Sequence, residues 1–140
     1  MNNIHATLIS YNNMGILFIG KSGNGKSDLA LRMIIDKGAV LVADDRVNLA
    51  LSNNELYGFA PKELYGKMEV RGLGIVDFKP KEKEKIMLCV ELVNKREDVE
   101  RMPESETINF LGVSLTKIKL YPFDCSTICK IVTKISGIIS

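Results

Sequence analysis

A glycine-rich octapeptide between two apolar segments constrains this sequence more than any other feature. The segment Gly20-Lys21-Ser22-Gly23-Asn24-Gly25-Lys26-Ser27 fits the pattern G-x-x-x-x-G-K-[ST]. It follows the apolar run Ile16–Ile19, which is typical of a buried strand. It precedes Ser27–Asp36, where apolar residues recur at helical spacing, and Gly38 is placed to end that helix. The order of strand, glycine loop and helix predicts a loop that binds phosphate.

The residue types of this loop suit a nucleoside triphosphate. Glycines adopt backbone torsions that are closed to other residues, so successive N–H groups can point inward at phosphate oxygens. Lys26 can bridge the β and γ phosphates, and the Ser27 hydroxyl can bind Mg²⁺. All eight residues, Gly20 to Ser27, are therefore predicted to bind ATP with Mg²⁺. The alternative is a glycine-rich turn without a function.

The rest of the chain predicts an α/β fold, a single domain over residues 1–140 with a mixed sheet. The segment Val99–Glu106 is predicted to be a loop or helical turn, Lys79–Lys85 a solvated turn, and 70–76 resists a label. Further strands are predicted at Ala6–Tyr11, Val40–Ala43, Val47–Leu51, Leu56–Phe59, Ile86–Val93 and Ser114–Leu120, with a closing helix from about Cys125 to Ile138. A tight turn is predicted at Asn12-Asn13-Met14-Gly15, and a hairpin around Ser52-Asn53-Asn54-Glu55.

Charge and hydropathy argue against two classes of partner. The 19 basic and 17 acidic residues leave a net charge of +2, too balanced to predict binding of nucleic acid. No apolar run approaches the roughly 20 residues that span a bilayer. The first residues, Met1 to His5, lack a basic segment followed by an apolar one, so no export signal is expected. A cytoplasmic location is expected.

The three cysteines predict no metal site. Cys89, Cys125 and Cys129 are an odd number in a chain without an export signal, which favours reduced thiols. Cys125 and Cys129 would share one face of a helix, but the chain has one histidine and no C-x-x-C pair. All three are therefore expected to be small buried residues.

Two neighbouring carboxylates follow the strand predicted at Val40–Ala43. A phosphoryl-transfer enzyme needs a carboxylate near Mg²⁺ and often one that orients or deprotonates the acceptor. If Val40–Ala43 packs beside the strand that leads into the loop, Asp44 or Asp45 reaches the γ-phosphate. Adjacent residues of a strand face opposite ways, so only one is expected to point into the site, and which one stays open. The alternative is a turn-forming pair.

Three other polar residues are candidates of lesser weight. Glu69 and Arg71 are spaced to share one face of an extended chain, which suits a metal ligand beside a phosphate clamp and equally a surface salt bridge. His5 is the only histidine, and a lone histidine near a chain start is more often structural or exposed than functional.

Taken in order, these segments resemble one family. His5 stands one strand before the loop Gly20–Ser27, Ala43-Asp44-Asp45-Arg46-Val47 follows, and then comes Met68-Glu69-Val70-Arg71-Gly72-Leu73-Gly74-Ile75-Val76-Asp77. The arrangement is similar to the catalytic domain of HPr kinase/phosphorylase, a bacterial enzyme of the phosphotransferase system. That resemblance implies a P-loop fold like that of phosphoenolpyruvate carboxykinase and assembly as a homo-oligomer, a hexamer in the family.

The resemblance also implies an activity and a role for each matching residue. It implies ATP-dependent phosphorylation of a serine in an HPr-like phosphocarrier protein, with possible reversal by inorganic phosphate. Lys26 would bind the phosphates, Ser27 and Glu69 the metal, and Asp44 would accept the serine proton. His5, Arg71 and Arg101 would be the other catalytic residues.

The sequence departs from long members of the family at both ends. It starts almost at His5, which resembles a short form without the separate N-terminal domain. The segment Lys119–Ser126 has no arginine where long members carry one in a loop that grips the protein substrate. Two alternatives to the kinase hypothesis are a nucleotide-binding regulatory module without kinase activity and a small-molecule kinase.

Overall fold

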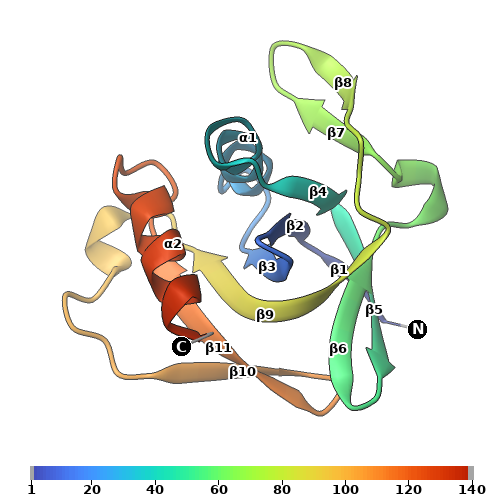
Figure 1. Cartoon of the computed structure of the whole chain (residues 1–140). Helices are drawn as coiled ribbons and strands as arrows, with labels where there is room; N and C mark the ends of the chain where they lie inside the picture. The colour runs from blue at the N-terminus through green and yellow to red at the C-terminus, as the bar shows by residue number, and fades with distance from the viewer. Residues whose placement is uncertain (1, 139–140) are drawn as a thin grey trace.

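The computed structural model describes residues 2–138, which form strands on a curved sheet and two longer helices (Figure 1). The elements in chain order are β1 (Asn2–His5), β2 (Thr7–Tyr11), β3 (Met14–Ile19), α1 (Lys26–Lys37), β4 (Val40–Ala43), β5 (Arg46–Ser52), β6 (Glu55–Phe59), the short 3₁₀ helix η1 (Lys62–Leu64), β7 (Lys67–Val70), β8 (Gly74–Asp77), β9 (Lys83–Leu92), the 3₁₀ helix η2 (Arg96–Asp98), β10 (Glu106–Phe110), β11 (Val113–Leu120) and α2 (Thr127–Ile138).

The main sheet is mixed, as predicted. Within residues 2–138 its strands run in the order β1-β5-β6-β9-β3-β2-β4, and β11 joins β9 and carries β10. The pairs β3–β9 and β9–β11 are parallel, and the other pairs are antiparallel. The strand β9 therefore lies in the middle of the sheet and forms the curved floor seen in Figure 1.

Both faces of β3 are buried, which explains its continuous apolar sequence. Ile16 and Phe18 belong to the core under α1 and α2, together with Met33 of α1 and Ile131 of α2. Leu17 points to the opposite face, into a second core of residues from β2, β5, β6, β9 and β11. Successive side chains of a strand point to opposite faces, so a strand covered on both sides needs apolar residues at every position.

Short turns connect the predicted strands where the sequence carries asparagine pairs. Asn12 and Asn13 have φ values of 50° and 62°, and Asn53 and Asn54 have 53° and 64°. Two consecutive left-handed residues are the geometry of the tight hairpin turn that asparagine tolerates. The hairpins β2–β3 and β5–β6 and the helix α1, capped by Gly38 at φ 70°, are confirmed.

The structure differs from the sequence predictions in how one strand is placed. The strand β4 pairs with β2 at the edge of the sheet and not with β3, which leads into the glycine loop. The assumption that Val40–Ala43 packs beside β3 was therefore wrong. The strand β2 forms a hairpin with β3 and lies between β3 and β4. The closing helix begins at Thr127, two residues later than expected.

Two strands and one hairpin lay outside the sequence predictions. The strand β1 pairs with β5, and β10 pairs with β11, although most of the side chains of both added strands are exposed or half-buried. The unlabelled segment 70–76 is the turn and second strand of the hairpin β7–β8. This hairpin forms a separate two-stranded sheet that projects beyond α1 (Figure 1).

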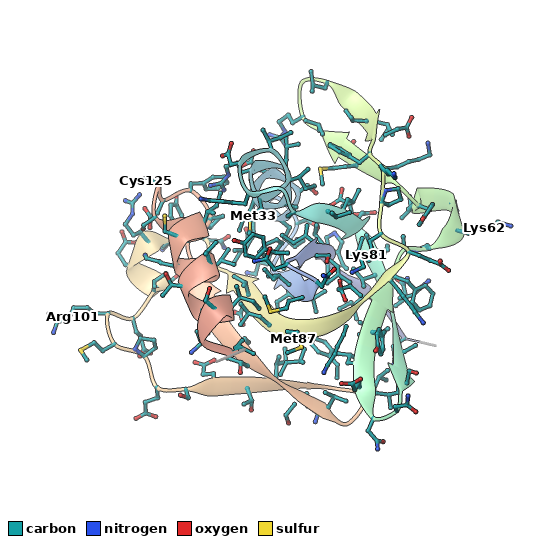
Figure 2. All side chains as sticks on the ribbon, viewed as in Figure 1. Met33, Lys62, Lys81, Met87, Arg101 and Cys125 are labelled. Carbon is teal, nitrogen blue, oxygen red and sulfur yellow. The ribbon has the colours of Figure 1, made fainter. Side chains whose placement is uncertain are left out.

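The expectation that all three cysteines are buried is wrong for two of them. Cys89 lies on β9 in the core, whereas Cys125 and Cys129 are exposed, and Figure 2 shows Cys125 at the outer end of α2. Cys125 precedes the first residue of α2 and Cys129 lies on its exposed face, so neither packs against the sheet.

No helix within residues 2–138 is long and apolar enough to cross a membrane.

Candidate functional site

The loop Gly20–Ser27 joins the end of β3 to the start of α1 with the backbone shape that its glycines predict. Gly20, Gly23 and Gly25 have φ values of 149°, 84° and 85°. Residues with a side chain rarely adopt these torsions, which turn successive N–H groups inward. A Cβ atom at Gly23 would meet nothing within 4 Å, so this glycine is required by its torsion and not by crowding.

The start of the loop is held against the end of β9. A Cβ atom at Gly20 would lie 2.9 Å from the carbonyl oxygen of Leu92, closer than a real Cβ comes to a backbone atom. The side-chain amide of Asn24 donates a hydrogen bond of 3.2 Å to the same oxygen. Gly20 therefore permits the approach of β9, and Asn24 fastens the loop to it.

Lys26 lies under the loop and not in solvent. The residue is 6% exposed, and its Nζ atom donates to the carbonyl oxygens of Gly20 and Lys21 at 2.9 and 3.1 Å. Burial lowers the pKa of Lys26 below its ordinary value, while the charges of Asp44 and Asp45 act in the opposite direction. A buried ammonium group gains from any anion that comes within reach, so the loop favours a bound phosphate.

Asp44 is tied to the loop by a direct hydrogen bond. Its Oδ1 atom accepts from the hydroxyl of Ser27 at 2.6 Å and from the hydroxyl of Thr7 at 2.9 Å. Asp44 is 4% exposed and Thr7 is fully buried. Sequence reasoning missed Thr7, since a threonine in a strand has no pattern of its own. Its place on β2, between β3 and β4, brings it to the carboxylate.

Asp45 lies in the open part of the site, with 65% of its side chain exposed. Its φ of 71° places it in the left-handed region, which aspartate tolerates better than most residues. Its Oδ1 atom lies 3.2 Å from Nε2 of His5, and both side chains are partly exposed. The turn between β4 and β5 thus separates two adjacent carboxylates, one buried at Ser27 and one paired with His5.

A cavity of about 780 Å³ opens beside the loop. It is bounded by the first turn of α1 and by His5, Asp45 and the hairpin β7–β8, which contributes Glu69 and Arg71. With Phe123, which also lines the cavity, five segments that are distant in sequence meet at one place. Among the residues predicted from the sequence, His5, Ser22, Gly23, Gly25, Lys26, Ser27, Glu69 and Arg71 line this cavity.

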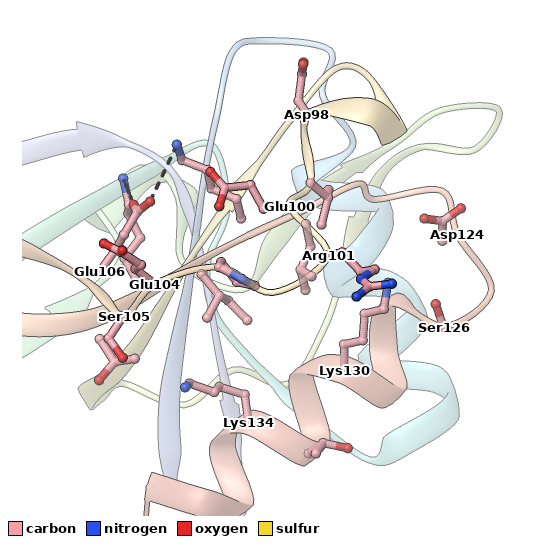
Figure 3. Close-up of a pocket in the computed structure, with 18 of the residues that line it drawn as sticks. Asp98, Glu100, Arg101, Glu104, Ser105, Glu106, Asp124, Ser126, Lys130 and Lys134 are labelled. Carbon is pink, nitrogen blue, oxygen red and sulfur yellow. Dashed lines mark ion pairs between the residues drawn. The ribbon is translucent and has the colours of Figure 1, made fainter.

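Arg101 does not join them in this chain. It lies on the loop between β9 and β10 at the outer edge of the molecule (Figure 2). It lines another cavity, of about 1020 Å³, between this loop, β11 and α2. Figure 3 shows Arg101 and Lys130 of α2 with their charged ends toward the same part of that cavity. The catalytic role predicted for Arg101 stays a prediction.

The oxygen atoms at Ser27 fit a magnesium ion. Mg²⁺ takes oxygen ligands and is usually held by one or two carboxylates, substrate phosphates and water. The Ser27 hydroxyl and Asp44 Oδ1 are close enough to share one ion, and Glu69 lines the same cavity. Within residues 2–138, no three His, Cys, Asp or Glu side chains gather into a metal-binding cluster. The metal-ligand role predicted for Glu69 stays a prediction.

Known proteins share both the sequence and the fold. A family model described as the HPr Serine kinase C-terminal domain matches residues 1–135. The HPr kinase/phosphorylases of Burkholderia lata and Burkholderia cenocepacia are 37% and 36% identical over 127 residues, which is 84% of this chain and 39% of each relative. The chain thus spans about two fifths of the length of these relatives.

A solved structure has the same fold as this chain. The Hpr(Ser) kinase/phosphatase from Coxiella burnetii superposes with a TM-score of 0.84 at 26% identity, over 98% of this chain and 89% of that one. The family match, the fold and the geometry of the glycine loop point the same way: this chain belongs to the HPr serine kinase C-terminal domain family.

Proposed function

We propose that this protein transfers the γ-phosphoryl group of ATP to a serine hydroxyl of an HPr-like phosphocarrier protein. The observation that carries the proposal is the hydrogen bond between Ser27 and the buried Asp44, because Ser27 also lines the cavity that contains Lys26, Asp45 and Glu69. The relatives named HPr kinase/phosphorylase support the choice of acceptor.

The loop binds the donor in this proposal. The backbone N–H groups of residues 20–27 and the ammonium group of Lys26 hold the phosphates, and Ser27 and Asp44 hold Mg²⁺. When bound, the ion neutralises charge on the phosphate oxygens. Two of the three N–H donors of Lys26 bind the carbonyl oxygens of Gly20 and Lys21, which leaves the third for a phosphate oxygen.

The acceptor serine requires a base, and the geometry favours Asp45 for this role. The serine oxygen attacks the γ-phosphorus, its proton passes to the carboxylate, and the bond to the β-phosphate oxygen breaks to release ADP. Asp44 is buried and accepts two hydrogen bonds at one oxygen, so an incoming serine cannot readily reach it. Asp45 lines the cavity, and His5 orients its carboxylate. We therefore assign to Asp45 the role of the base that accepts the serine proton, and to Asp44 the role of a metal ligand.

The hairpin β7–β8 completes the site on the opposite side. Arg71 lines the cavity as a cation that suits the charge of the transferred phosphoryl group, and Glu69 faces the same space. In the reverse direction an oxygen of inorganic phosphate attacks the phosphorus of phosphoserine, the bond from that phosphorus to the serine oxygen breaks, and pyrophosphate leaves while the protonated Asp45 returns its proton to the serine oxygen. One carboxylate thus serves both directions.

Transfer of label tests the proposal directly. Purified protein is incubated with [γ-³²P]ATP, Mg²⁺ and an HPr-like protein, and we expect label on the acceptor's serine. An acceptor whose serine is replaced by alanine must stay unlabelled. The variant Lys26→Ala must lose transfer by at least about 100-fold, since it removes the cation under the loop. Binding of ATP without any labelled acceptor would contradict the kinase and support a regulatory module, and label on a metabolite would support a small-molecule kinase.

A further inference from the structure

The segment between β11 and α2 brings an aromatic ring to the phosphate loop. Phe123 lies in residues 121–126 and lines the same cavity as Ser22, Gly23 and Lys26. It is 55% exposed, although phenylalanine is among the more apolar residues. Sequence reasoning gave Phe123 no role.

The ring is in direct contact with the loop. A Cβ atom built on Gly25 would lie 2.9 Å from Cζ and 3.2 Å from Cε1 of Phe123. Gly25 is the residue before Lys26 and the N-cap of α1. One edge of the ring therefore rests on the loop, and the exposed part of the ring adjoins the space in which a nucleotide would lie.

Neighbouring residues hold the segment on both sides of the ring. Tyr121 packs edge-to-face against Phe123, with ring centroids 5.7 Å apart and planes at 78°. The guanidinium group of Arg96 lies 5.1 Å from the centroid of Tyr121 and pairs with Asp124 at 2.6 Å.

The backbone of the segment is anchored as well. Arg32 of α1 donates a hydrogen bond to the carbonyl oxygen of Pro122, and the hydroxyl of Thr127 donates to that of Tyr121 at 2.6 Å. These contacts fix the ring without covering it. A half-exposed ring held rigidly beside a phosphate loop has the features of a stacking platform, because stacking gains most when little side-chain freedom is lost.

We propose that Phe123 is the platform on which the base of the nucleotide stacks. The inference rests on the proposed function, since it presumes that the triphosphate lies in the loop. The cavity of about 780 Å³ is within the range of sites that enclose a ligand of this size. Stacking on a ring accepts any base, because every base has a π-face.

A single tryptophan reports this contact directly, because the chain has no tryptophan of its own. The variant Phe123→Trp keeps an aromatic platform, and stacking of a base should quench its emission. We expect ATP with Mg²⁺ to quench the emission with saturation, and tripolyphosphate, which has no base, to leave it nearly unchanged while competing with ATP. The matched control is Tyr65→Trp, since Tyr65 is 45% exposed and lines neither cavity. Its emission should not respond to ATP. Equal quenching of Phe123→Trp by tripolyphosphate would overturn the proposal.

Affinity gives a second and independent measurement. Phe123→Ala should weaken ATP binding by roughly tenfold or more while leaving tripolyphosphate binding within about twofold. Lys26→Ala should weaken both ligands, and thermal unfolding of each variant checks that it is folded. If wild type binds both ligands and Phe123→Ala binds ATP as tightly as wild type, the platform is refuted and the phosphate site stands. If wild type binds neither ligand, the proposed function fails, and with it the platform.

Discussion

The hydroxyl of Ser27 donates a hydrogen bond of 2.6 Å to Oδ1 of Asp44, across a separation of 17 residues in sequence. Ser27 belongs to the first turn of α1, and Asp44 follows the edge strand β4. The contact joins the phosphate loop to a buried carboxylate. It also divides the two neighbouring aspartates into different roles, since Asp45 faces the cavity and His5.

Asp44→Asn should act on the metal. The amide keeps the shape of the side chain and can still accept from Ser27 and Thr7, but it removes the negative charge at the metal position. We expect the Mg²⁺ concentration for half-maximal transfer to rise roughly 10- to 100-fold, with part of the rate restored at high Mg²⁺. Initial rates over a series of Mg²⁺ concentrations measure this. If Asp44→Asn depends on the Mg²⁺ concentration in the same way as wild type, Asp44 is not a metal ligand.

The variant Asp45→Asn should lower the rate of phosphoryl transfer. Asparagine cannot accept the serine proton, so single-turnover transfer should fall at least about 100-fold. The Kd for ATP should change little, since Asp45 lies outside the loop, and added Mg²⁺ should not rescue the rate. Calorimetry and rapid-quench kinetics separate the two quantities. The variant Asp44→Asn serves as the control. If Asp45→Asn retains wild-type turnover while Asp44→Asn loses turnover that added Mg²⁺ does not restore, Asp44 is the base and the assignment to Asp45 is wrong.

Glu84 should make stability depend on pH. Burial opposes its ionisation, but hydrogen bonds from Lys81, Ser10 and its neighbour's N–H outweigh burial and leave the pKa of Glu84 below its ordinary value of 4.5. A lowered carboxyl pKa contributes stability that is complete above the unfolded-state pKa and is lost as pH falls through the folded-state pKa. Wild type should therefore lose Tm more steeply than Glu84→Gln below about pH 4.5.

The same variant should be less stable at neutral pH. At pH 7, Glu84→Gln weakens the hydrogen bonds from Ser10 and Lys81, which should lower the free energy of unfolding by about 1–3 kcal/mol. Denaturant titration at pH 7 and at pH 3.5 measures both effects. Glu82→Gln is the matched control, since Glu82 is exposed two residues away and should change either value little. Parallel pH profiles for wild type and Glu84→Gln would contradict the prediction.

The three thiols should differ in reactivity. Burial raises the pKa of Cys89 to about 12, with Lys117 lowering and Glu91 raising it to a smaller extent, and its side chain is 0% exposed. Only a thiolate reacts with a disulfide reagent, so Cys89 should stay protected at pH 8 while the exposed Cys125 and Cys129 react. Titration with DTNB should show two fast thiols in folded protein and a third only in denaturant. The variant Cys89→Ala should lose that third thiol alone.

Local structure followed from residue types at particular places. The run Ile16–Ile19 predicted a strand, and the asparagine pair at 12–13 predicted the turn before it, because both signals are local. The strand β10 was not predicted, since Glu106–Phe110 has polar and apolar side chains that are mostly exposed. Its pairing with β11 stabilises the strand, and nothing in its own sequence indicates this pairing.

By itself, the sequence determined that a phosphate loop lies between a strand and a helix, because glycine torsions, one lysine and a serine at fixed spacing specify that local geometry. Only the tertiary structure decided which groups meet the loop. Strand β4 pairs with β2 and not β3, the carboxylate of Asp45 pairs with His5, and the segment after β11 places Phe123 against Gly25. The strand pairing and the contact of Phe123 join residues 30 to 98 positions apart, and long-range pairing depends on packing, which no local pattern encodes.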